Sequence, residues 1–112
     1  MFVVITIYLK PLEEVNKWYP EHFAWLEKYY ASGHFLGSGR RVPPVGGIII
    51  ARAESQEALR SILDEDPFWQ NGLMKYEVFE FNPGLLPRRS AELEAFLRRP
   101  LQKEEAPPSV AD

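Results

Sequence analysis

Cysteine is absent from the 112-residue sequence, and long hydrophobic runs are absent as well. Without thiols, the chain has no disulfide scaffold, no zinc–thiolate site and no cysteine nucleophile. The apolar run at residues 1–9 is too short for a membrane span or a signal peptide. We therefore expect a cytoplasmic protein that has no membrane partner.

A surplus of basic residues is also lacking, because the formal net charge is -3 and no basic stripe is interleaved with aromatic residues. This composition argues against a nucleic-acid partner, since such proteins carry clustered Lys and Arg. Apolar residues make up 46% of the chain and aromatic residues 13%, which is enough for a core and for a pocket with large flat surfaces. The length fits one domain of common size.

Four short apolar segments predict strands, and two amphipathic segments predict helices between them. In chain order we expect a strand at 2–9, a helix at 20–33, strands at 34–38 and 47–51, a helix at 55–63 and a strand at 75–81. This β-α-β-β-α-β order predicts an α+β, ferredoxin-like antiparallel sheet. In that fold the first and third strands are central, and right-handed crossovers place both helices on one face.

The composition changes after Pro83, which divides the chain into two predicted parts. Residues 1–83 form the expected domain, and residues 84–112 form a C-terminal extension. Within the extension, residues 90–99 have the spacing of a short amphipathic helix. The polar, proline-containing tail that begins at Pro100 has the composition of a disordered segment.

The two central strands are apolar on both faces, although helices cover only one face of such a sheet. The other face would expose Val and Ile side chains over an area that soluble monomers rarely tolerate. We therefore predict a homodimer in which two sheets pack face to face. The alternative is that the segment Leu85 to Leu97 folds back over that face.

The predicted topology brings a histidine and a carboxylate together. The two helices run antiparallel, so His22 near the start of the first lies beside Asp66 at the end of the second. The second strand ends at the same edge of the sheet, so Ser38, Arg40 and Arg41 are also expected close to His22 and Asp66. Arginine suits planar anions, so these residues are candidates for binding a carboxylate or phenolate; the alternative is a solvated turn.

In several ordered motifs the sequence resembles the YciI-related family, from about residue 2 to residue 83. The motifs are His22 with Trp25 and Leu26, the run at 33–39 (GHFLGSG), the run at 44–47 (PVGG), Asp66-Pro67-Phe68, Gly72-Leu73 and the strand at 76–81. The resemblance implies a ferredoxin-like dimeric α/β barrel with an active site at His22 and Asp66. Similar proteins include dehydrochlorinases of aromatic degradation. Many members have proline after the glycine where this chain has Arg40.

His22 is the candidate general acid or base, because imidazole exchanges protons near neutral pH. An ionised Asp66 within hydrogen-bond reach would fix the tautomer and stabilise the imidazolium. The simpler interpretations are a core histidine and a helix N-cap before Pro67. Asp66 can serve both purposes, since its two oxygens can accept from different donors. Phe68 is the aromatic candidate for substrate contact.

We expect an isomerase or a dehydrochlorinase-like lyase that acts on a small anionic, aromatic or enol-type molecule. No metal or other cofactor is expected, since two histidines in separate elements do not have the spacing of a metal site. The alternative is a small-ligand-binding or accessory module without turnover. A third possibility is haem binding with His22 as axial ligand.

Overall fold

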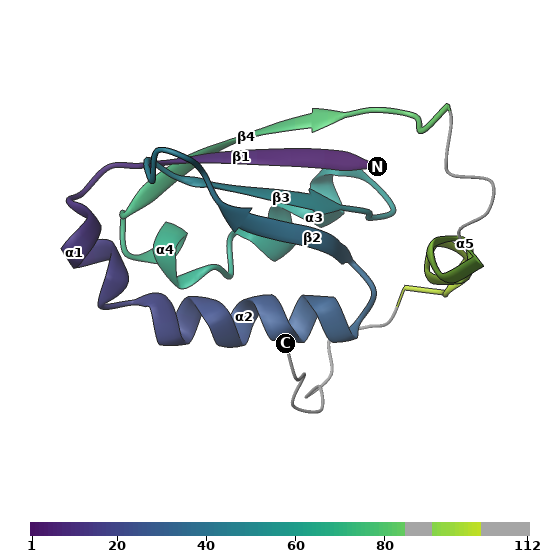
Figure 1. Ribbon diagram of the computed structural model, residues 1–112, viewed down its shortest axis with the longest axis horizontal. Coiled ribbons are helices and arrows are strands. Elements are labelled where there is room, and N and C mark those ends of the chain that lie inside the picture. The colour runs from purple at the N-terminus through teal and green to yellow at the C-terminus, as the bar shows by residue number, and fades with distance from the viewer. Residues whose placement is uncertain (85–90, 102–112) are drawn as a thin grey trace.

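The computed structural model describes residues 1–84 and 91–101 of the chain. Within them the chain forms a sheet backed by helices, with one further helix beyond the end of the sheet (Figure 1). The strands are β1 (Phe2–Tyr8), β2 (Phe35–Arg40), β3 (Gly47–Ala51) and β4 (Met74–Glu80). The helices are α1 (Leu12–Asn16), α2 (Tyr19–Ala31), α3 (Gln56–Leu63), α4 (Pro67–Gln70) and α5 (Ala91–Arg98).

All strand pairs are antiparallel, and the strand order is β2-β3-β1-β4. The first and third strands are therefore central, as the sequence predicts. The element order and the antiparallel sheet confirm the predicted α+β architecture. The second strand was predicted to end at residue 38, and this is wrong by two residues. Gly39 and Arg40 pair with Ile48 and Gly47 and so extend it.

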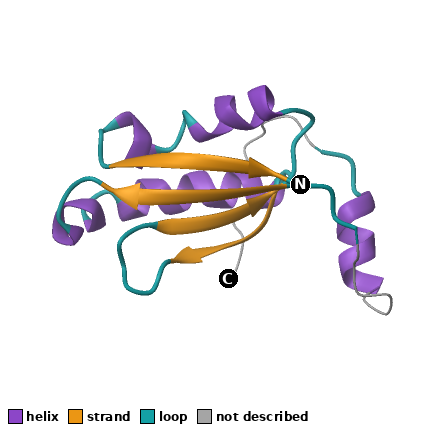
Figure 2. Ribbon diagram, turned by 90° about the horizontal axis from the view of Figure 1, so that it is seen from above, coloured by secondary structure: helices purple, strands orange, loops and turns teal. Residues whose placement is uncertain are grey.

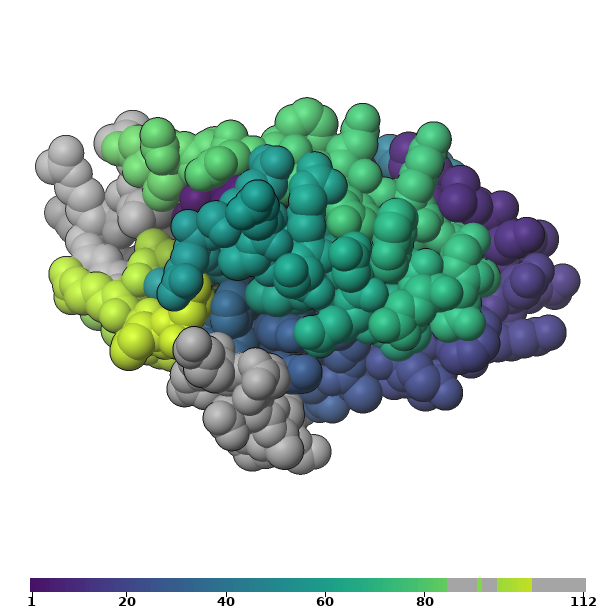
Figure 3. Space-filling view, turned by 180° about the vertical axis from the view of Figure 1, so that it is seen from behind, coloured from purple at the N-terminus to yellow at the C-terminus, as the bar shows by residue number. Residues whose placement is uncertain are grey.

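The helices α2, α3 and α4 cover one face of the sheet. Figure 3 shows α3 and α4, in teal to green, packed beside the blue α2. Trp25 of α2 fixes this packing, because its indole N–H donates to the carbonyl of Ile62 in α3 at 3.0 Å. The main core lies between these helices and the sheet. It includes Phe2, Val4, Trp25, Tyr29, Phe35, Leu59 and Leu63.

Local sequence signals explain where the site-bearing helices begin and end. Pro20 lies in the first turn of α2, where its missing N–H costs no hydrogen bond. Gly33 follows that helix with φ of +92°, a conformation that glycine adopts without steric cost. Asp66 precedes α4 and accepts from the backbone N–H of Phe68, while Pro67 takes the first helical position. In the described part of the chain, no helix is long and apolar enough to cross a membrane.

The second face of the sheet is largely apolar, with Lys75 and Glu77 of β4 also on it, and has no described element over it (Figure 2). Strand alternation and the pairing register place six apolar side chains on this face, which we call the open face. They are Val3, Ile5, Ile7, Ile48, Ile50 and Phe79. The exposed fractions are 52% for Phe79, 39% for Ile48 and 38% for Ile7.

The helix α5 does not cover the open face, because it lies past the end of the sheet (Figures 1 and 2). The guanidinium of Arg52 holds it there by donating to the carbonyl of Leu97 at 2.6 Å and to that of Gly33 at 3.0 Å. The predicted tail beyond residue 101 and the link at 85–90 lie outside the described residues.

Candidate functional site

His22 and Asp66 form a direct contact, although 44 positions separate them in sequence. The distance from Nδ1 of the imidazole to Oδ1 of the carboxylate is 2.8 Å. His22 comes from the first turn of α2, and Asp66 is the residue before α4, so the contact joins the two helical segments that the topology predicts to meet. An ionised carboxylate can only accept, so this geometry places a proton on Nδ1.

Asp66 is held rigidly by its surroundings. Only 3% of its side chain is exposed, against 15% for His22. The expectation that its two oxygens serve different donors is wrong in detail. Oδ1 accepts both from Nδ1 of His22 and from the backbone N–H of Phe68, the latter at 3.0 Å. One carboxylate oxygen has two lone-pair directions, so the helix cap and the imidazole contact can share it.

Phe68 fixes the plane of the imidazole. Its ring stacks on that of His22 with a centroid distance of 4.0 Å and an interplanar angle of 5°. The rings of Phe68 and Tyr8 make an edge-to-face contact, with centroids 6.1 Å apart and an interplanar angle of 88°. The ring of Trp25 lies 5.6 Å from the imidazole on α2 itself. A ring stacked on one side and hydrogen-bonded through one nitrogen has little freedom to rotate.

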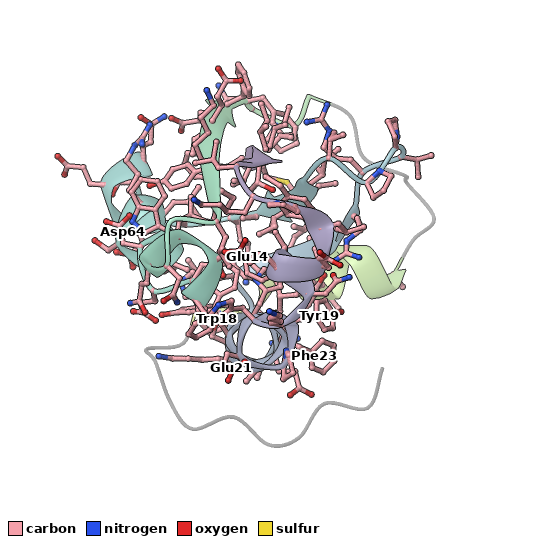
Figure 4. The ribbon with its side chains drawn as sticks, turned by 90° about the vertical axis from the view of Figure 1, so that its left-hand side faces the viewer. Glu14, Trp18, Tyr19, Glu21, Phe23 and Asp64 are labelled. Carbon is pink, nitrogen blue, oxygen red and sulfur yellow. The ribbon has the colours of Figure 1, made fainter. Side chains whose placement is uncertain are left out.

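A pocket of about 720 Å³ opens beside this pair, between α2 and the sheet. Its lining includes His22, Asp66 and Phe68, together with Ile49 from the sheet. Figure 4 looks along α2 and shows Tyr19 and Phe23 on one side of that helix, with Trp18 on the other. Tyr19 and Phe23 line the pocket, which is thus largely apolar, with a few polar groups. Ligand sites are commonly built in this way.

The structure separates the other predicted site residues. Ser38 and Arg40 line the pocket from β2. Arg41 does not line it, because strand alternation turns its side chain away and its Nη1 lies 3.4 Å from the carbonyl oxygen of Thr6. Trp69, the residue after Phe68, is 40% exposed and contacts Tyr76 outside the pocket.

Several lining residues were not recognised from the sequence. Thr6 lies on the helix-facing side of β1 and accepts from the backbone N–H of Gly47 at 2.7 Å. Tyr30 shares a hydrogen bond of 2.8 Å with the hydroxyl of Ser38. The period-two alternation of strands could have identified Thr6. Nothing local marks Asn16, which reaches the pocket only because of where α1 ends.

The other histidine lies outside the pocket. Nδ1 of His34 is 2.6 Å from the hydroxyl of Ser32. Burial lowers the pKa of His34 below its usual value of 6.5, the charge of Arg52 lowers it further, and Glu54 acts in the opposite direction. Within residues 1–84 and 91–101, no three His, Asp or Glu side chains gather as a metal-binding group would.

Comparisons with known proteins agree with this fold. The sequence model of the YCII-related domain matches residues 1–82. No curated protein has a matching sequence. A solved structure with the same fold is 5-chloro-2-hydroxyhydroquinone dehydrochlorinase (TftG) from Burkholderia phenoliruptrix AC1100, in complex with 2,5-dihydroxybenzoquinone. The TM-score is 0.62 at 24% identity, and the match covers 73% of this chain and 94% of that one.

Proposed function

Because the chain belongs to the YCII-related domain family, we propose that it is an enzyme that transfers a proton on a small anionic, aromatic or enol-type molecule. His22 is the general acid or base, and Asp66 orients it. The observation that carries this proposal is the 2.8 Å contact between Nδ1 and Oδ1 at the wall of an otherwise largely apolar pocket.

The geometry supports a defined role for each nitrogen of His22. With the proton held on Nδ1 by Asp66, neutral imidazole keeps its lone pair on Nε2. Nε2 takes a proton from the substrate, and the buried carboxylate stabilises the imidazolium that forms. The stacked ring of Phe68 holds the imidazole plane during this step. No metal ion or other cofactor is needed for proton transfer of this kind.

The reaction class we favour is isomerisation or elimination of the dehydrochlorinase type. In such an elimination, the base removes one proton from the substrate while the carbon–chlorine bond breaks. Chloride leaves with its electron pair, so no oxidant or reductant is required. TftG, which shares the fold, acts on a chlorinated hydroxyhydroquinone and binds a hydroxylated quinone. The aromatic lining of the pocket suits flat rings of this size.

The test is a screen of chlorinated hydroquinones, with and without a ring carboxylate, and of enol lactones, with chloride release or product formation as the readout. For a compound that turns over, His22→Gln should lower kcat by about a hundredfold to ten-thousandfold. Asp66→Asn should also lower kcat, because a neutral amide no longer stabilises the imidazolium that forms when His22 takes the proton. His34→Gln is the matched control, since this histidine lies outside the pocket.

Two outcomes would contradict the proposal. One is full activity in folded His22→Gln and Asp66→Asn variants, with folding checked by circular dichroism. The other is ligand binding by the wild type with no product from any compound of the panel. That second result would instead favour a small-ligand-binding module without turnover.

We also propose that the functional unit is a homodimer built on the open face. The central strand β1 contributes Val3, Ile5 and Ile7 to it, and none of the described elements covers them. Gly37 and Gly39 of β2 continue this face, and both have open space where a Cβ would stand. Such a surface permits close approach of a second sheet. Stable protein–protein interfaces bury about 800 Å² per partner, which is within the reach of a four-stranded face.

A further inference from the structure

Among the described residues, one cation of the pocket forms no ion pair, although the carboxylates of Glu27 and Asp66 share the lining. Arg40 is the last residue of β2, and its guanidinium faces the pocket. In the described part of the chain the ion pairs are those of His22 with Asp66 and of Lys28 with Glu65, so neither includes Arg40. Arg40 is also the only Lys or Arg in the described lining of the pocket.

Neutral groups hold the Arg40 side chain in place. Its Nη2 donates to the side-chain oxygen of Asn16 at 2.8 Å, and its Nε donates to the hydroxyl of Tyr8 at 3.2 Å. The guanidinium carbon lies 5.7 Å from the ring centroid of Tyr8 and 6.0 Å from that of Tyr19. A guanidinium has five N–H donors, and these contacts use only two of them. The remaining donors are available to a bound anion.

Ring contacts connect this cation to the imidazole. Arg40 lies over the ring of Tyr8, the rings of Tyr8 and Phe68 are perpendicular, and Phe68 stacks on His22. Tyr19 contacts both groups, with its ring centroid 6.0 Å from that of His22 and 6.0 Å from the guanidinium carbon of Arg40, so the two groups lie in one pocket. A molecule bound in this pocket can therefore meet both a proton acceptor and a guanidinium.

We infer that Arg40 is a specificity-determining residue, which binds a carboxylate carried by the aromatic ring of the substrate. The planar fork of arginine matches a carboxylate, and stacking against tyrosine keeps the fork oriented. A binding site that is held in place before the ligand arrives loses less entropy on binding. The inference rests on the proposed function for the identity of the pocket as the substrate site, and it narrows the substrate class to ring carboxylates.

The experiment compares two ligands that differ only in the carboxylate. These are 2,5-dihydroxybenzoate and hydroquinone, with dissociation constants measured by isothermal titration calorimetry. The wild type should bind the carboxylate at least about tenfold more tightly, as expected for a charge-assisted hydrogen bond. Arg40→Gln should abolish this preference for the carboxylate. Arg40→Lys should retain part of it, because the lysine ammonium is a point charge without the planar fork of arginine. Arg41→Gln should keep it, since Arg41 does not line the pocket.

Two results would overturn the inference: a wild type that does not prefer the carboxylate, or an Arg40→Gln variant that keeps the preference. Circular dichroism shows whether each variant is folded, and Arg40→Lys provides a second, milder change. The ratio of the two dissociation constants, measured in His22→Gln, separates this inference from the proposed function. If His22→Gln keeps the preference but also keeps full turnover, the proton-transfer role fails while the carboxylate site stands. If His22→Gln loses turnover and Arg40→Gln keeps the preference, only the carboxylate site fails.

Discussion

At the scale of single residues, Phe68 has a role that its position after Pro67 does not reveal. Its ring stacks on the imidazole of His22 with the ring centroids 4.0 Å apart, and only 3% of the residue is exposed. Phe68→Leu removes this stack while keeping most of the apolar volume. We expect kcat to fall by up to about tenfold, the equivalent of about 1.4 kcal/mol.

The control for that variant is Trp69→Leu, which removes the neighbouring aromatic ring outside the pocket. Steady-state kinetics on a turned-over substrate gives both values. Equal rates for Phe68→Leu and the wild type would show that the stack does not position the imidazole.

His34 predicts how stability depends on pH. Burial and then the charge of Arg52 lower its pKa in the folded state below 6.5, whereas Glu54 raises it. Between the folded and the unfolded pKa, the unfolded chain binds more protons, so the free energy of unfolding decreases as pH falls through that window. Well above about pH 6.5 both states are neutral at this site, and the contribution of His34 to stability is constant.

Urea unfolding of the wild type and His34→Gln from about pH 8 to about pH 5 measures how much His34 contributes to the pH dependence of the free energy of unfolding. The variant should lose less stability than the wild type on acidification. Parallel stability curves for the two proteins would refute the assignment to His34.

At the scale of elements, the sequence predicted those parts of the fold that have local signals. Pro20, Gly33 and the Asp66-Pro67 pair mark helix ends, and the all-apolar segments mark the central strands. The approach of His22 to Asp66 followed from topology, because an antiparallel helix pair brings those ends together. The end of β2 was missed, since glycine and arginine have weak strand preferences and only pairing with β3 extends it.

Side-chain directions at the pocket could not be predicted in the same way. Arg40 and Arg41 are neighbours with equal chemistry, yet only Arg40 lines the pocket. The strand register decides between them, and the register depends on the partner strand. Asn16 belongs to the site only through tertiary packing.

Gly46 allows the turn before β3 to pack closely against the backbone of β1. A Cβ at this position would stand 1.8 Å from the carbonyl oxygen of Thr6, which is backbone and cannot yield. Gly46→Ala should therefore lower the free energy of unfolding by about 3 kcal/mol or more, at the upper end of overpacking effects. Gly84→Ala is the control, because open space surrounds that position. Thermal and urea unfolding give the comparison. If Gly46→Ala loses no more free energy of unfolding than Gly84→Ala, the close packing of Gly46 against Thr6 is contradicted.

At the scale of the whole molecule, the open face governs assembly. Ile5 lies on this face in a central strand, opposite Ile48 of β3. Ile5→Lys places a charge in the proposed interface and should shift the wild-type dimer to a monomer. Light scattering after size-exclusion chromatography gives the masses, and Gln56→Lys, exposed on α3, is the matched charge control. A monomeric wild type would contradict the dimer, and so would a dimeric Ile5→Lys variant.

The central claim is that Asp66 holds the imidazole of His22 with its proton on Nδ1, so that Nε2 accepts the substrate proton. Long-range ¹H–¹⁵N correlation NMR of the imidazole rings reports the tautomer directly, and His34→Gln assigns the remaining signal to His22. We predict the Nδ1–H tautomer for neutral His22 in this protein, and its loss in Asp66→Ala, which removes the acceptor oxygen. A neutral His22 with its proton on Nε2 in the protein with Asp66 intact would contradict the account.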